Sequence, residues 1–156
     1  MQFRDGFLVL GRVWQAPIRI HWSTPLVAFA LTSFSFVPGA WLGFLVLVLV
    51  HELGHAALVR AFGAHVVSVN ATGLGGTCEW YGDVTAKQRA IIAWGGVLAQ
   101  GALYIVARFA AIILPSWGFI GQLMYSLTVT NILLIAVNLL PIRPLDGAEA
   151  WRLFKR

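Results

Sequence analysis

Four long apolar stretches dominate this chain and restrict what it can fold into. They cover residues 22–37, 41–62, 89–114 and 119–140. The last three are long enough to cross the roughly 30 Å hydrocarbon core of a bilayer as helices, which takes about 20 apolar residues. The first is short for a span and reaches across only if it borrows interfacial residues or tilts little. The sequence therefore predicts a multi-pass integral membrane protein with about four transmembrane helices.

The composition excludes several other classes of protein. The 156 residues are 59% hydrophobic and 11% charged, whereas a soluble domain is about 45–50% apolar and about 25% charged. Such a chain cannot cover itself with polar surface, which rules out an ordinary soluble enzyme, a disordered tail and a nucleic-acid-binding module. We therefore expect a lipid bilayer as its surroundings and no nucleic-acid partner. The single cysteine, Cys78, fits a reducing compartment.

The segments between the apolar stretches are short and polar. Residues 1–21 have a mixed composition and are predicted to form an interfacial arm. Residues 64–84 alternate at period two on either side of a glycine-rich turn, which predicts a β-hairpin. Residues 145–156 read as a short amphipathic helix. We thus expect an all-α membrane protein with a small cytoplasmic β-hairpin or sheet between the second and third spans, organised as a single domain over 1–156.

Basic residues are distributed unevenly along the chain and predict its orientation. Ten of the 11 lysines and arginines flank one side of the predicted spans, and the two opposite loops carry none. By the positive-inside rule, both termini and the hairpin face the cytoplasm. We expect a prokaryotic cytoplasmic membrane, with the site described next opening on its cytoplasmic side. The ten residues are Arg4, Arg12, Arg19, Arg60, Lys87, Arg89, Arg143, Arg152, Lys155 and Arg156.

The second apolar stretch contains the sequence His51-Glu52-Leu53-Gly54-His55. Ionisable groups in hydrocarbon are costly and therefore indicate function. Histidines four apart on a helix point the same way, so His51 and His55 form the first half of a zinc site, with Glu52 as general base. Counted from Trp41 at 1.5 Å per residue, the motif lies roughly 12 Å from the cytoplasmic face. A polar kink satisfied by neighbouring helices is disfavoured, because three costly residues in one turn need a shared reason.

A catalytic zinc needs a third protein ligand and one open position. The segment from Asn138 to Gly147 contains Pro141 and Pro144, which open the backbone beside the last span. Irregular backbone at membrane depth is tolerated only around a buried site. We therefore expect Asp146, where a new helix can begin, to complete the site. The candidates considered were His21, His65, Cys78, Glu79, Asp83, Asp146 and Glu149.

Together the two motifs resemble those of the site-2 protease family of intramembrane zinc metalloproteases. Residues 51–55 match its H-E-x-x-H helix, and 138–147 match its N-x-x-P…L-D-G segment. The arm 18–22 and the glycines of 73–76 also look like that family, although these features are weak alone. The resemblance covers most of the chain.

The resemblance implies both a site and a reaction. One Zn²⁺ per chain would be held by His51, His55 and Asp146, with Glu52 activating a zinc-bound water and Asn138 contacting the substrate. The protein would then hydrolyse a peptide bond within or next to a transmembrane segment of a membrane protein. The hairpin would offer an edge strand to the unwound substrate, which is β-augmentation, or would serve only as a flap over the zinc.

The chain departs from the family pattern in three respects. It ends nine residues after Gly147, so we expect a compact member without the later helices. We also expect no PDZ or nucleotide-sensing domain. The third predicted span begins Trp94-Gly95-Gly96, where the family has a glycine-proline pair.

Two alternatives remain open. In another class of membrane zinc protease, Glu149 would replace Asp146 as a ligand. The chain could also be a degenerate, non-proteolytic zinc-binding subunit that binds transmembrane helices, although the intact Glu52 argues against this. An oligomer is compatible with either reading.

The third apolar stretch carries three polar residues at a spacing of four, which places them on one face of a helix. They line either a wet groove or, as we favour, a packed interface: Gln100, Tyr104 and Arg108.

Overall fold

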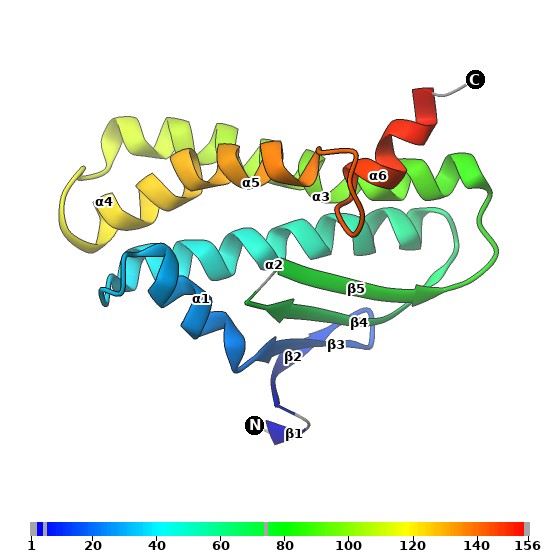
Figure 1. Ribbon diagram of the computed structural model, residues 1–156, viewed down its shortest axis with the longest axis horizontal. Coiled ribbons are helices and arrows are strands. Elements are labelled where there is room, and N and C mark those ends of the chain that lie inside the picture. Colours follow the sequence, from blue (N-terminus) through cyan, green and yellow to red (C-terminus); the bar gives the residue numbers. More distant parts are fainter. Residues whose placement is uncertain (1–2, 5, 74, 155–156) are drawn as a thin grey trace.

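The computed structural model describes residues 3–4, 6–73 and 75–154 and consists of a layer of helices packed on one small sheet (Figure 1). Besides α-helices and strands, the chain contains one π-helical turn, labelled η1, and one 3₁₀ turn, labelled η2, among the described residues. In chain order the elements are β1 (Phe3–Arg4), β2 (Phe7–Val13), β3 (Ala16–His21), α1 (Ser23–Leu31), α2 (Pro38–Ala61), β4 (His65–Thr72), β5 (Gly75–Tyr81), α3 (Ala86–Ile113), α4 (Gly118–Tyr125), η1 (Ser126–Thr130), α5 (Asn131–Asn138), α6 (Gly147–Ala150) and η2 (Trp151–Phe154).

Helix α2 occupies the centre of the molecule. In Figure 1, α3 and the α4–η1–α5 rod lie on one side of α2, and the sheet lies on the other. A helix that is apolar on all sides is expected to be enclosed in this way. The helix that carries the His-Glu-His motif is therefore positioned by both layers.

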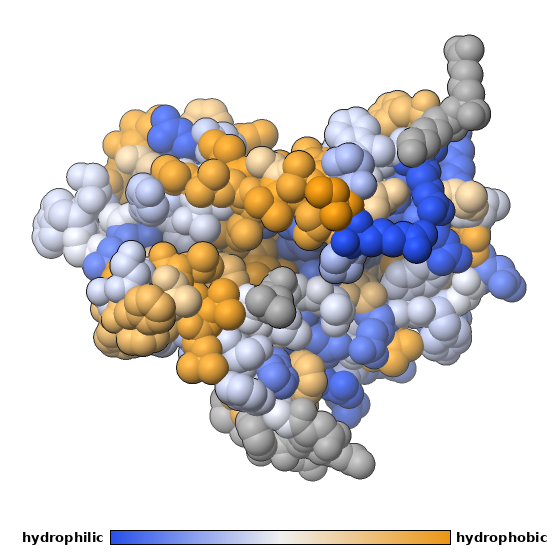
Figure 2. All heavy atoms as spheres, in the orientation of Figure 1, coloured by the Kyte–Doolittle hydropathy of each residue, from blue (hydrophilic) through white to orange (hydrophobic). Residues whose placement is uncertain are grey.

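Among the described residues, three helical segments are long and apolar enough to cross a membrane: 38–61, 86–113 and 118–138. They agree within a few residues with the last three predicted spans. The first predicted span, 22–37, is not one long helix, because α1 covers only nine residues. Apolar side chains gather over α1, α4 and α5, whereas hydrophilic ones gather over the sheet and α6 (Figure 2).

The predicted small sheet is present and is larger than a hairpin, so the description all-α is too loose. Its five described strands are arranged in the order β1-β2-β3-β4-β5. The predicted hairpin over 64–84 is present as β4 and β5, which pair antiparallel. The predicted interfacial arm, 1–21, differs from expectation because it supplies the other three strands. Its last strand, β3, pairs parallel with β4, with Ile20 opposite Ala71.

The inner end of the sheet lies far along α2. Ala71 packs against Phe44 and Val48 of α2 and Ala28 of α1. At 1.5 Å per residue, Val48 is about 20 Å from the end of α2 at Ala61. The sheet thus runs beside α2 into the apolar part of the molecule. This depth explains why α1 is short, because α1 starts at the inner end of the sheet.

Two hydrogen bonds fasten the start of α1 to the hairpin. The Thr24 hydroxyl donates to the Ala71 carbonyl at 3.2 Å. The backbone N–H of Gly73 donates to the Ser23 hydroxyl at 3.0 Å. Gly73 has no room for a side chain, since a Cβ there would lie 2.6 Å from the carbonyl oxygen of Ser23. The hairpin turn and α1 are therefore held together.

Glycines allow α2 and α3 to approach closely. A Cβ on Gly95 would lie 2.6 Å from the carbonyl oxygen of Gly54. Small residues at such crossings are typical of helix packing in membranes. Gly95 belongs to the segment that departs from the family pattern, and its glycine is explained here by the close packing of α3 on α2.

Two tryptophans tie the last segment to the rest of the fold. The Trp94 indole N–H donates to the Ala150 carbonyl at 3.1 Å. The Trp151 indole N–H donates to the Leu139 carbonyl at 2.6 Å. The irregular stretch 139–146 is therefore anchored at both ends, against α3 and against α6. The sequence predicts a short helix over 145–156; residues 147–154 are helical, as α6 and η2, and residues 155–156 lie outside the described residues.

Candidate metal centre

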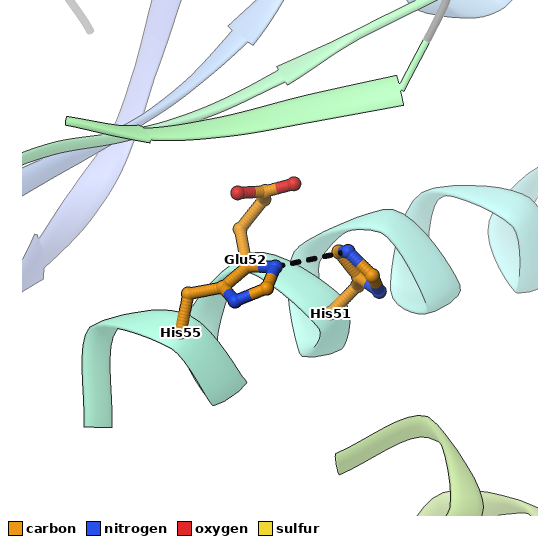
Figure 3. A group of neighbouring side chains, drawn as sticks. All are labelled: His51, Glu52 and His55. Carbon is orange, nitrogen blue, oxygen red and sulfur yellow. Dashed lines mark hydrogen bonds between the residues drawn. The ribbon is translucent and has the colours of Figure 1, made fainter. Parts of the chain in front are cut away.

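His51, Glu52 and His55 are buried in the middle of the molecule, with side-by-side imidazole rings (Figure 3). Because residues four apart share one face of a helix, the two rings lie with their centroids 4.7 Å apart. Their Nε2 atoms are 3.1 Å apart. Glu52 points to the side of β5 instead. The predicted arrangement of the three side chains on α2 is thus present.

Asp146 joins the two histidines from a distant part of the chain. Its Oδ2 lies 2.7 Å from His51 Nε2 and 3.2 Å from His55 Nε2. Glu149, the alternative third ligand, instead forms an ion pair with Arg152 at 3.1 Å. The structure therefore brings Asp146 to the place where a third ligand is needed.

The chemistry of these atoms fits a metal ion. His55 Nδ1 lies 2.7 Å from the Ile92 carbonyl oxygen, which can only accept a hydrogen bond. His51 Nδ1 lies 3.0 Å from Gln100 Oε1. When both Nδ1 atoms carry hydrogens, both Nε2 lone pairs face Asp146. Tetrahedral zinc, with bonds of about 2.0–2.1 Å, separates its ligands by about 3.4 Å, close to the spacing of these three atoms.

The electrostatics around Asp146 favour the ionised form of its carboxyl group. Burial by itself would raise the pKa, but when both imidazoles are protonated and donate through Nε2, the hydrogen bonds and charges of His51 and His55 outweigh burial and lower it well below the usual range. Metal ligands must be deprotonated. Asp146 therefore offers a carboxylate throughout the neutral pH range.

Glu52 is held between α2 and β5. Its carboxylate points toward β5 (Figure 3) and lines the same cavity as Cys78. A Cβ on Gly76 would lie 2.6 Å from Glu52 Cδ, so this glycine leaves room for the carboxylate. A Glu52 oxygen lies within 4.8 Å of ligand atoms of both histidines. That distance leaves room for a water molecule between the carboxylate and a metal.

The centre opens into a cavity of about 750 Å³. Its polar wall is formed by the His-Glu-His motif, Asp146 and residues 75–78 of β5. Its apolar wall includes Val27 of α1 and Leu134 of α5. Asn138 lines the cavity at the end of α5, so it is positioned where the predicted substrate contact needs it. That contact remains a prediction.

The other candidate ligands have different surroundings. His21 bonds the Ser23 hydroxyl at 2.7 Å, and the exposed His65 stacks on Tyr81. Glu79 accepts from the Ser68 hydroxyl at 3.0 Å. Cys78 does line the cavity.

Cys78 is poorly suited to act as a metal ligand. Burial, followed by the charges of Glu52 and Glu79, raises the pKa of its thiol to about 12. Only a thiolate is an effective ligand. The structure thus gives Cys78 the properties of a packed thiol.

Sequence reasoning missed the contribution of α3. Gln100 was assigned to packing, yet it contacts His51 directly. Gly96 was noted only as a departure from the family pattern, yet a Cβ there would lie 2.6 Å from His51 Nδ1. A buried amide one helical turn after a glycine was the available signal, but by itself it does not identify a partner.

We expect Gly96→Ala to disrupt the centre while Gly101→Ala does not. The His51 ring is fixed by Gln100 and Asp146, so it cannot yield to a new Cβ without losing one of them. A displacement of about 1 Å at a catalytic group costs on the order of 100-fold in rate. A Cβ on Gly101 meets nothing within 4 Å on the same helix. Zinc content and peptide hydrolysis of the two variants check this, and equal behaviour of both would contradict it.

Comparisons with known proteins place these observations in a wider context. No family model matches the chain. Stage IV sporulation protein FB of Bacillus subtilis is 38% identical over 113 residues, which cover 70% of this chain and 38% of that protein. Putative zinc metalloprotease Rip3 of Mycobacterium tuberculosis is 29% identical over 97% of this chain and 44% of its own length. The chain spans less than half the length of these curated relatives.

A solved structure has the same fold. The site-2 protease from Methanocaldococcus jannaschii matches 95% of this chain and 71% of its own chain with a TM-score of 0.75 and 22% sequence identity. The fold is thus that of a site-2 protease, and the similarity to the family that the motifs indicated is confirmed. The three apolar helices agree with an integral membrane protein.

Proposed function

We propose that this chain, which has the fold of a site-2 protease, is an intramembrane zinc metalloprotease. It would hydrolyse a peptide bond within or next to a transmembrane segment of a membrane protein. The observation that carries this proposal is the convergence of Asp146 on His51 and His55, with the carboxylate of Glu52 beside them. A purely structural metal site has no use for such a carboxylate.

We assign His51, His55 and Asp146 as the residues that would hold the metal ion. When bound, zinc supplies Lewis-acid chemistry, lowering the pKa of water and polarising a peptide carbonyl. Glu52 removes a proton from the attacking water and delivers it to the leaving nitrogen as the peptide bond breaks. Gly76 of β5 leaves the room in which the Glu52 carboxylate makes both transfers.

We further propose that β5 receives the substrate. A transmembrane helix hides its carbonyl groups, so it must unwind before attack. In the described sheet, β5 is one of the two edge strands, and its residues 75–78 line the cavity. A strand edge can pair with an unwound peptide through main-chain hydrogen bonds. Asn138, on the opposite wall, would bind the backbone of the same peptide.

The charge asymmetry supports a cytoplasmic position for the cavity mouth and for both ends of the described chain. The apolar surface of the helices supports direct contact with lipid. For example, Phe109, Ile112 and Ile113 of α3 are large, apolar and largely exposed. The substrate would reach the site from the membrane, and a prokaryotic cytoplasmic membrane fits this arrangement.

Reconstitution with a substrate tests the proposal. The purified chain is placed in liposomes with epitope-tagged single-pass membrane proteins, and fragments are mapped by mass spectrometry. We expect cleavage within or beside the transmembrane segment. A zinc chelator should abolish this cleavage and added zinc should restore it, because the ligand residues without the metal ion cannot lower the pKa of water. Capture of transmembrane helices without cleavage in any zinc-loaded sample would favour the non-proteolytic alternative.

A further inference from the structure

Gln100 connects α3 to the candidate metal centre. Its side chain is 1% exposed, and its Oε1 lies 3.0 Å from His51 Nδ1. An amide oxygen only accepts hydrogen bonds, so this contact is a hydrogen bond when Nδ1 carries the hydrogen, which is the tautomer that a metal ion on Nε2 requires. In the neutral ring, Nε2 then carries the lone pair. Nε2 is the atom that lies 2.7 Å from Asp146 Oδ2.

One face of α3 serves both imidazoles. Ile92, Gly96 and Gln100 are spaced four residues apart and therefore share a face. The Ile92 carbonyl accepts from His55 Nδ1, and Gly96 leaves room for the His51 ring. Side chains on a helix lean toward its N-terminus, which brings the Gln100 amide back over this space. The face thus fixes the orientation of both rings from behind.

A second buried amide links α5 to α3 at the Gln100 backbone. The Asn131 amide donates to the Gln100 backbone carbonyl at 2.9 Å and to the Leu127 carbonyl at 3.2 Å. Asn131 is completely buried and directly follows the π-helical turn η1. Its side chain bonds the backbone of Gln100 and takes no part in the Gln100–His51 contact. The chain therefore provides a second buried amide that links helices without contacting an imidazole.

We propose that Gln100 is a positioning residue that holds His51 in the tautomer able to bind the metal. The identity of that metal as zinc rests on the proposed function. Outer partners of metal-bound histidines fix ring orientation and tautomer, and their loss typically costs about 10–100-fold in metal affinity. A Gln100 that only linked α2 to α3 would affect folding and leave zinc affinity unchanged.

Zinc affinity and thermal unfolding of the full chain in detergent test this proposal without any substrate. Affinity is measured by competition with a chromophoric chelator, and unfolding is measured on metal-free protein. We expect Gln100→Leu to lose about 10–100-fold in zinc affinity while the metal-free protein unfolds at the parent temperature. Gln100→Glu keeps an acceptor oxygen at the same reach and should restore the affinity to within about threefold of the parent.

Asn131→Leu is the matched control and should bind zinc within about threefold of the parent. Unchanged affinity in Gln100→Leu, failure of Gln100→Glu to recover it, or an equal loss in Asn131→Leu would each overturn the assignment. Gln100→Asn withdraws the acceptor by one methylene and gives the same test should the leucine variant not fold. A parent chain that does not bind zinc would overturn the proposed function itself, which keeps the two failures distinct.

Discussion

Glu52→Gln is expected to abolish proteolysis while leaving the protein folded and zinc-loaded. Glutamine has about the same size as glutamate and fits the same space beside Gly76, but it cannot take a proton from water. General base catalysis contributes roughly 10²–10⁴-fold to rate, so kcat should fall by about that factor. The measurement is cleavage of a tagged transmembrane substrate in liposomes, together with zinc content and the unfolding temperature.

Glu79→Gln provides the control for this substitution. Glu79 lies on the same strand as Cys78, and its carboxylate bonds the Ser68 hydroxyl instead of facing the histidines. Activity within about threefold of the parent is expected, as for a surface change away from the site. Full activity of Glu52→Gln, with normal zinc content, would remove Glu52 from the reaction.

Asp146→Ala should lose both zinc and activity, whereas Glu149→Ala should keep both. Asp146 is the carboxylate that reaches both imidazoles, so its removal leaves two ligands where a catalytic zinc has three. Loss of an outer partner costs about 10–100-fold in metal affinity, and loss of a direct ligand should exceed that range. Zinc titration of the two purified variants measures the difference.

The same two variants also distinguish the two classes of membrane zinc protease, in which the third ligand is either Asp146 or Glu149. Glu149 pairs with Arg152, so its removal should leave the metal centre intact. Zinc loss in Glu149→Ala with retention in Asp146→Ala would reverse the assignment. Circular dichroism of both variants establishes that the α6 segment still folds.

Much of the fold follows from patterns that are local in the sequence. The three long helices are recognisable because each is a continuous apolar run, and the hairpin because its alternation is interrupted by glycines. The geometry of His51 and His55 follows from helical periodicity alone. The contact of Asp146 was predictable because prolines at membrane depth need a buried site to explain them.

Other features depend on contacts that no local pattern contains. The strand β3 was visible as a short alternation, but its parallel partner β4 comes after two intervening helices. Residues 22–37 were interpreted as a span because their composition is apolar, whereas the helix is short because it begins at the inner end of the sheet. Gln100 is one polar side chain in an apolar helix, and only the tertiary structure reveals which ring it contacts.

The depth of the sheet has a consequence for hydration. Backbone N–H and C=O groups on the free edge of β5 cannot remain in hydrocarbon without partners. Before a peptide docks there, solvent molecules must occupy the cavity and satisfy that edge. Hydrolysis consumes a solvent molecule at the same place. If β5 receives the peptide as proposed, its hydrated edge would also supply the water that hydrolysis consumes.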